Sequence, residues 1–125
     1  IAGARRLRGE GFANTLTTMK GFLGKAIMRF ASRRHTIIGV VATNARLNKE
    51  GVNKVAQMAH DGIARVVRPS HTMFDGDTLF ALATSEKKAD VNLIGAYGAE
   101  AVSAVILSAV RQAKGAGGLP ACRDL

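Results

Sequence analysis

The stretch TIIGVVATNA, residues 36–45, decides the fold because it holds the clearest strand signal in the chain. Residues 37–43 are rich in β-branched side chains, and Asn44 ends the apolar run. The run is continuously apolar instead of alternating, which is typical of a strand covered on both faces. We therefore expect a buried strand with Thr36 at its entrance.

Downstream of this strand the sequence predicts a helix, a second strand and a long helix. Residues 47–67 carry apolar residues at helical spacing, with Asn48 as the N-cap and Arg68-Pro69 as the stop. Residues 78–84, TLFALAT, predict a second buried strand, and residues 91–113 a helix dominated by small residues. One line of that helix is suited to close packing: Gly95, Ala99, Val102 and Ile106.

Upstream lies a basic leader, residues 1–35, in which residues 15–30 have the pattern of one amphipathic helix. The leader has eight Lys/Arg and one Glu, so it carries +7 of the net charge of +9. It lacks the interleaved aromatic residues of a nucleic-acid stacking surface. We expect a solvated connecting segment, with no nucleic acid and no membrane as partners.

Length and composition set further bounds. A chain of 125 residues, 47% of them apolar, can form one domain with a core, here residues 36–125 behind the leader. The single Cys122 cannot form an internal disulfide, which favours a reducing compartment such as the cytoplasm. We expect no secretory signal, and no apolar run long enough to span a membrane. Two strands make a poor sheet, so we expect more strands from another chain or a missing portion.

Two motifs carry candidate chemistry. Thr36 is either β-branched strand filler or a nucleophile whose own α-amino group serves as base once the preceding bond is cut. The sequence Asp75-Gly76-Asp77 is either a turn or a pair of carboxylates that the glycine directs toward one site.

Other residue types that could bind a ligand match no known pattern. His60 and His71, together with the two aspartates, have no familiar metal-ligand spacing, and there is no second cysteine. The glycines at 115, 117 and 118 open no helix, so they form no phosphate loop. We expect no metal and no cofactor.

Taken together, TIIGVVATNARLNKEGVNKVAQMAHDGIARVVRP and HTMFDGDTLFALAT resemble the self-cleaving family of L-aminopeptidase/D-esterases and β-peptidyl aminopeptidases. The resemblance runs over residues 21–120 and is densest over residues 36–84. It implies an α/β fold that is part of a four-layer αββα sandwich, incomplete without the N-terminal portion of the family. That portion is the expected partner chain, in a homo-oligomer of such units.

The resemblance also implies roles for individual residues. Thr36 matches the nucleophile, exposed by autocleavage between His35 and Thr36, where the family usually has Asn or Gly before the bond. Asp77 matches the carboxylate that orients or helps to protonate the new α-amino group. Asp75 stands where some members have Ser, and is expected to support the hydroxyl network.

The resemblance therefore implies a hydrolase, an N-terminal nucleophile aminopeptidase, amidase or esterase that releases N-terminal residues from short peptides, amides or esters. Acyl transfer like that of ornithine acetyltransferase, which also uses a self-exposed threonine, is one alternative. A non-catalytic module that binds through its basic leader is the other.

Overall fold

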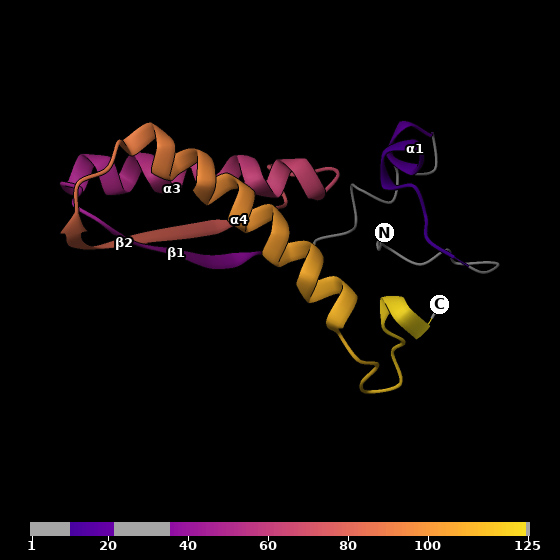
Figure 1. The fold of residues 1–125 in the computed structure, drawn as a ribbon. Helices are drawn as coiled ribbons and strands as arrows, with labels where there is room; N and C mark the ends of the chain where they lie inside the picture. Colours follow the sequence, from indigo (N-terminus) through magenta and orange to yellow (C-terminus); the bar gives the residue numbers. More distant parts are fainter. Residues whose placement is uncertain (1–10, 22–35, 125) are drawn as a thin grey trace. The chain divides into compact units, whose positions relative to one another are not determined.

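The computed structural model describes residues 11–21 and 36–124 (Figure 1). The chain divides into two compact units, one of Arg34–Ile106 and one of Ile1–Arg33 with Leu107–Leu125. Each unit is described by itself below.

The first of these units is a β–α–β–α arrangement. β1 (Ile38–Ala45) and β2 (Thr78–Lys87) form a parallel two-stranded sheet, joined by α3 (Lys49–Val66) and followed by α4 (Val91–Gln112). All four elements are those that the sequence predicts, so the mixed α/β class is confirmed.

The register of the sheet runs evenly from Ile38 opposite Thr78 to Thr43 opposite Ala83. It then shifts, so that Ala45 lies opposite Lys87. Ser85 takes a positive φ of 63° at this irregularity. The shift lets β2 continue three residues beyond the predicted end at residue 84, which the apolar pattern alone did not predict.

α3 begins and ends where its capping residues predict. The Asn48 side chain accepts a hydrogen bond from the Gly51 N–H at 2.8 Å, which satisfies one of the free donors of the first turn. The helix ends at Val66, three residues before Pro69. Its buried side is made of Val55, Ala59, Gly62 and Ile63.

α4 packs closely against α3 through small residues. A Cβ atom at Gly62 would collide with the carbonyl oxygen of Ala99, so only glycine permits this approach of the two helices. The Ser103 hydroxyl lies 3.0 Å from the Gly62 carbonyl oxygen and can donate to it across the interface. The core then joins both helices to β2 through Ala59, Ile63, Leu79 and Val102. The predicted close-packing line of α4 is confirmed.

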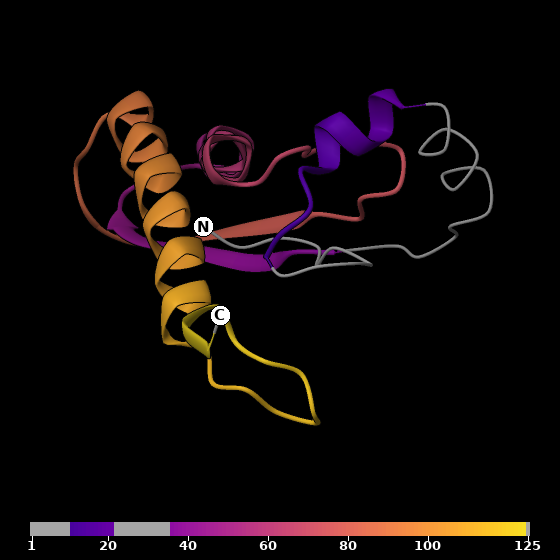
Figure 2. The ribbon, with the colours of Figure 1, turned by 90° about the vertical axis from the view of Figure 1, so that its right-hand side faces the viewer.

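α3 and the buried line of α4 pack on the same face of the sheet, where Val102 joins the core at Leu79 and Gly98 adjoins Val41. Figure 2 shows α3 end-on above the strands, with α4 beside it. The opposite face is apolar but exposed, with exposed fractions between 48% and 73% for Ile38, Val40, Phe80 and Leu82. The prediction that both faces of the strands are covered is therefore wrong for the residues described. The apolar pattern of the strands fits a sheet with a layer on each face, but the described residues supply only the helix layer on one face.

α4 also corrects the prediction about membrane-spanning segments. Its 22 residues have a mean hydropathy of 1.7 over an 18-residue window, so by length and composition the helix could cross a membrane. A helix on the core of a domain has the same composition, and the buried line of α4 packs on α3 in this way.

The other unit contains α1 (Thr15–Lys20), which Asn14 caps by accepting from the Thr17 N–H, and the C-terminal tail. The prediction of one helix over residues 15–30 is wrong, because the helix ends at Lys20, with Gly21 as a C-cap in an extended conformation. Residues 22–30 lie outside the described residues. The tail turns at Gly117 and Gly118, both with positive φ, before the short 3-10 helix η1 (Cys122–Asp124).

Candidate active site

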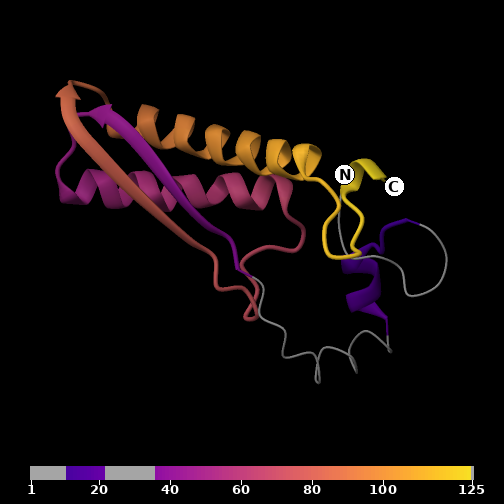
Figure 3. The ribbon, with the colours of Figure 1, turned by 90° about the horizontal axis from the view of Figure 1, so that it is seen from below.

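The candidate nucleophile lies at the amino end of the sheet. Thr36 is exposed and precedes β1 by two positions, while the Asp75-Gly76-Asp77 turn leads directly into β2. The amino ends of neighbouring parallel strands meet at one edge of a sheet. The two segments, about 40 residues apart in sequence, therefore lie side by side (Figure 3).

Two hydrogen bonds join these segments. Asp77 Oδ1 accepts from the Ile37 N–H at 2.9 Å, and the Thr78 N–H donates to the Ile37 carbonyl oxygen at 2.8 Å. The residue directly after Thr36 is therefore held on both sides of its backbone. A carboxylate as acceptor makes the first of these bonds stronger than a bond between neutral groups.

Gly76 lies directly against the Thr36 hydroxyl. A Cβ atom placed on Gly76 would be 2.9 Å from Thr36 Oγ1, and the next two nearest atoms outside the turn's own neighbouring residues, both at 3.9 Å, also belong to Thr36. The structure thus brings the candidate nucleophile and the turn into contact, at the one residue of the turn that has no side chain.

Asp75 closes a turn of its own. Its Oδ2 accepts from the Thr72 N–H at 2.7 Å, and its N–H donates to the Thr72 carbonyl oxygen at 3.1 Å. The Thr72 hydroxyl in turn accepts from the Phe74 N–H at 3.3 Å. The Asp75 carboxylate is therefore bonded within its own loop. It influences Thr36 indirectly, because it fixes the turn that holds Gly76 against the Thr36 hydroxyl.

Of the other predicted residues, His60 and His71 take no part in these contacts. His35 lies outside the described residues. The rings of His60 and His71 lie with their centroids 5.4 Å apart and tilted by 56°. Among the described residues, no group of three or more His, Cys, Asp or Glu side chains is placed to hold a metal ion.

Sequence reasoning missed the roles of Thr72 and of the Ile37 amide. The spacing of Thr72 and Asp75 is a signal for a side-chain-closed turn that could have been recognised. The bond between Asp77 and Ile37 joins residues 40 positions apart, and no local pattern indicates it.

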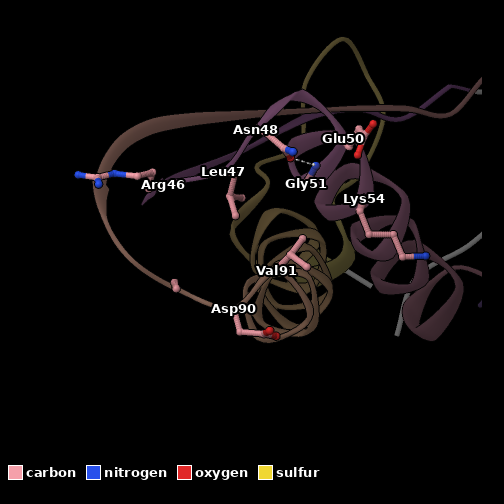
Figure 4. A pocket seen from close by; sticks show the side chains of 9 residues that line it. Arg46, Leu47, Asn48, Glu50, Gly51, Lys54, Asp90 and Val91 are labelled. Carbon is pink, nitrogen blue, oxygen red and sulfur yellow. Dashed lines mark hydrogen bonds between the residues drawn. The ribbon is translucent and has the colours of Figure 1, made fainter.

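A hollow of about 510 Å³ lies at the other end of the sheet, where the strands lead into α3 and α4 (Figure 4). Arg46 and Lys54 line it together with Glu50 and Asp90, so its formal charges balance. The eight residues of β1 separate it from Thr36 by roughly 26 Å. The hollow is therefore not where the candidate nucleophile would act.

Residues 4–121 match peptidase family S58. The chain belongs to that family. The resemblance, which runs over residues 21–120, is thereby confirmed at the level of the family.

This member of peptidase family S58 is similar to several bacterial proteins. It is 35% identical over 118 residues to an uncharacterized aminopeptidase of Mycobacterium tuberculosis, covering 82% of this chain and 34% of that protein. It is 38% identical over 104 residues to an uncharacterized aminopeptidase of Mycobacterium leprae, covering 71% and 29%. A 6-aminohexanoate-oligomer endohydrolase of Kocuria sp. is 34% identical over 76 residues, covering 61% and 21%. The chain thus spans about a third or less of the length of these relatives.

Proposed function

We propose that this chain is the nucleophile-bearing part of an N-terminal nucleophile hydrolase, with Thr36 as the nucleophile. Its substrates are short peptides, amides or esters from which it releases N-terminal residues. Membership of peptidase family S58 and the relatives named as aminopeptidases support the hydrolase class. The observation that carries the site is the contact of Thr36 with Gly76, inside a turn that has a carboxylate on either side.

The first step is the cut that exposes the nucleophile. Thr36 Oγ attacks the carbonyl carbon of His35, the C–N bond breaks, and His35 is left as an ester on the Thr36 side chain while the α-amino group becomes free. Water then hydrolyses the ester and restores the hydroxyl. The Asp77–Ile37 bond supports this step because it fixes the strand directly behind the reacting residue.

The second step uses the same hydroxyl on a substrate. A hydroxyl is a weak nucleophile and needs an adjacent base, which the free α-amino group of Thr36 supplies. The Thr36 oxygen attacks the substrate carbonyl, the amine or alcohol leaves with a proton, and water releases the acyl group. Asp77 orients the amino group through its position beside residues 36 and 37, and Asp75 supports the hydroxyl by holding the turn.

Intact mass spectrometry tests the first step. The protein is made with all flanking sequence that its gene encodes, beside Thr36→Ala. We expect two fragments that meet between His35 and Thr36 in the wild type, and one uncut chain in the variant. A wild type that stays whole and yet hydrolyses substrates would overturn the proposal.

A substrate panel tests the second step. Release of the first residue from short peptide amides supports the aminopeptidase, whereas internal cuts in 6-aminohexanoate oligomers would indicate an activity like that named for the Kocuria relative. Acetyl transfer between ornithine and glutamate without hydrolysis would favour the transferase alternative. Binding that weakens steeply with salt, with no turnover, would favour the basic binding module.

We further propose that the exposed apolar face of the sheet is covered by a second sheet, completing a four-layer αββα sandwich. Four apolar side chains on that face are exposed, and the relatives are about three times as long as the matched segment. The covering strands would come from the portion that this chain lacks, as a partner chain or as preceding sequence.

Substitution of two aromatic residues with similar exposure tests whether a second sheet covers the apolar face. Phe80, on the bare face, is 57% exposed, and Tyr97, on α4, is 61% exposed. In the full-length protein, Phe80→Ala should lower the free energy of unfolding by about 3 kcal/mol, as for a buried aromatic residue. Tyr97→Ala serves as the control and should cost clearly less. Equal small losses would contradict the second sheet.

A further inference from the structure

We propose that Gly76 is a positioning residue, whose missing side chain reserves the space in which the Thr36 hydroxyl is held. This inference rests on the proposed function of Thr36 and adds a residue that determines where the nucleophilic oxygen points. Gly76 itself takes no proton and makes no bond to substrate.

The contact is specific to the hydroxyl. A Cβ atom on Gly76 would approach Thr36 Oγ1 to 2.9 Å but stay 3.9 Å from Cβ and from Cγ2 of the same residue. The 3.9 Å distances are ordinary van der Waals contacts. The 2.9 Å approach is too close, so either the turn or the Thr36 hydroxyl must move. A methyl group at position 76 therefore conflicts with one atom, the proposed nucleophile.

The turn cannot easily move to relieve that conflict. On one side of Gly76, Asp75 is bonded twice to Thr72, through its carboxylate and through its N–H. On the other side, Asp77 is bonded to the Ile37 N–H. The Gly76 carbonyl oxygen itself accepts from the Thr78 hydroxyl at 3.2 Å.

The Thr36 side chain, in contrast, is exposed and can rotate. Threonine side chains occupy discrete staggered positions about χ1, so relief by rotation moves the hydroxyl to a different position. Reaction requires the attacking oxygen close to the carbonyl carbon and aligned with it, and a displacement of about 1 Å can cost about 10²-fold in rate. Gly76→Ala should therefore leave the fold intact and misplace the nucleophile.

The experiment compares Gly76→Ala with Gly98→Ala in the protein with all its flanking sequence. Gly98 is a matched control, because a Cβ there meets its nearest neighbours at 3.6–3.8 Å, an ordinary packing distance. We expect Gly76→Ala to slow both self-cleavage and kcat by about 10²-fold while KM changes little, and to change the χ1 rotamer of Thr36 in a crystal structure or by three-bond couplings. Gly98→Ala should change neither rate.

Second substitutions at position 36 distinguish a direct clash between residues 76 and 36 from a general effect of Gly76→Ala on the loop. Serine at position 36 lacks Cγ2, so its hydroxyl can adjust without moving a second heavy atom into the same space. Gly76→Ala should therefore cost less in the Thr36→Ser background than in the wild type. Likewise, any loss of thermal stability caused by Gly76→Ala should vanish in the Thr36→Ala background, a result that holds even for a variant with no activity.

The outcomes distinguish this inference from the function on which it rests. An unchanged Thr36 rotamer and wild-type rates in Gly76→Ala would overturn the role of Gly76 while leaving Thr36 as the nucleophile. A stability loss that persists without the Thr36 side chain would also overturn it. Full activity of Thr36→Ala would overturn the proposed function, and the rotamer would still report on Gly76.

Discussion

The two ends of the parallel sheet are built from the same four elements but differ in what holds them. At the amino end, hydrogen bonds join residues about 40 positions apart, with Asp77 accepting from Ile37. At the carboxyl end, the Arg46 N–H also donates across the sheet, to the Lys87 carbonyl oxygen. The acceptor side chains at that end act locally, because Asn48 and Asp90 each cap the helix that follows. The amino end carries the candidate nucleophile, and the carboxyl end carries the hollow.

The hollow and the candidate nucleophile thus lie at opposite ends of the sheet. At the start of α3 one backbone N–H, and at the start of α4 two, donate to the capping side chain, as at ordinary helix ends. The amino end presents a hydroxyl in contact with a turn that hydrogen bonds on both sides constrain. Substitutions at the two ends should therefore have different effects.

Asp77→Ala should show the largest effect. It removes the carboxylate that accepts from the Ile37 N–H, directly after the candidate nucleophile, so we expect self-cleavage and kcat/KM to fall by at least about 10²-fold. Intact mass over time and initial rates measure the two effects. Rates within a factor of about three of the wild type would mean that this end of the sheet is only a turn.

Asp75→Ala should have a smaller effect, mainly on stability. It leaves the Thr72 N–H without its acceptor and should lower the free energy of unfolding by about 1–2 kcal/mol in a denaturant titration. Asp75→Asn keeps an acceptor oxygen and should retain most of that stability. If the Asn variant instead loses activity as fully as the Ala variant, the charge of Asp75 acts on the reaction itself.

Asp90→Ala at the opposite end is the matched comparison for Asp77. Its carboxylate also accepts from backbone N–H groups, those of Asn92 at 2.9 Å and Leu93 at 3.1 Å. Loss of this cap should cost about 1 kcal/mol of stability and leave kcat/KM unchanged. A fall in kcat/KM as large as that of Asp77→Ala would remove the distinction between the two ends.

Lys54→Ala in the hollow should have the smallest effect. The side chain is exposed, so both stability and activity should stay within about 0.5 kcal/mol of the wild type, or about twofold. Thermal melting and initial rates measure this. A tenfold loss of activity would place the hollow in the reaction and contradict the comparison.

Most of the fold could be predicted because its signals are local. A β-branched run marks β1 and a short apolar run marks β2. Helical spacing, with Asn48 and Pro69 at its ends, marks α3, and small residues mark the packed line of α4. The last residues of β2 were missed because the register shift at Ser85 depends on pairing with β1. The covering of both sheet faces was predicted wrongly for the described residues, because a side chain's polarity does not say which element packs on it.

For the candidate site, the sequence by itself determined the residue types: a threonine at a strand entrance, a carboxylate–glycine–carboxylate turn, and their match to an S58 peptidase. Only the tertiary structure decided that they meet. Parallel pairing brings the amino ends of β1 and β2 together, and a hydrogen bond across 40 residues then fixes Ile37 on Asp77. The contact between Thr36 and Gly76 depends on that pairing, because the two residues are 40 positions apart in the sequence and only the packed structure brings them together.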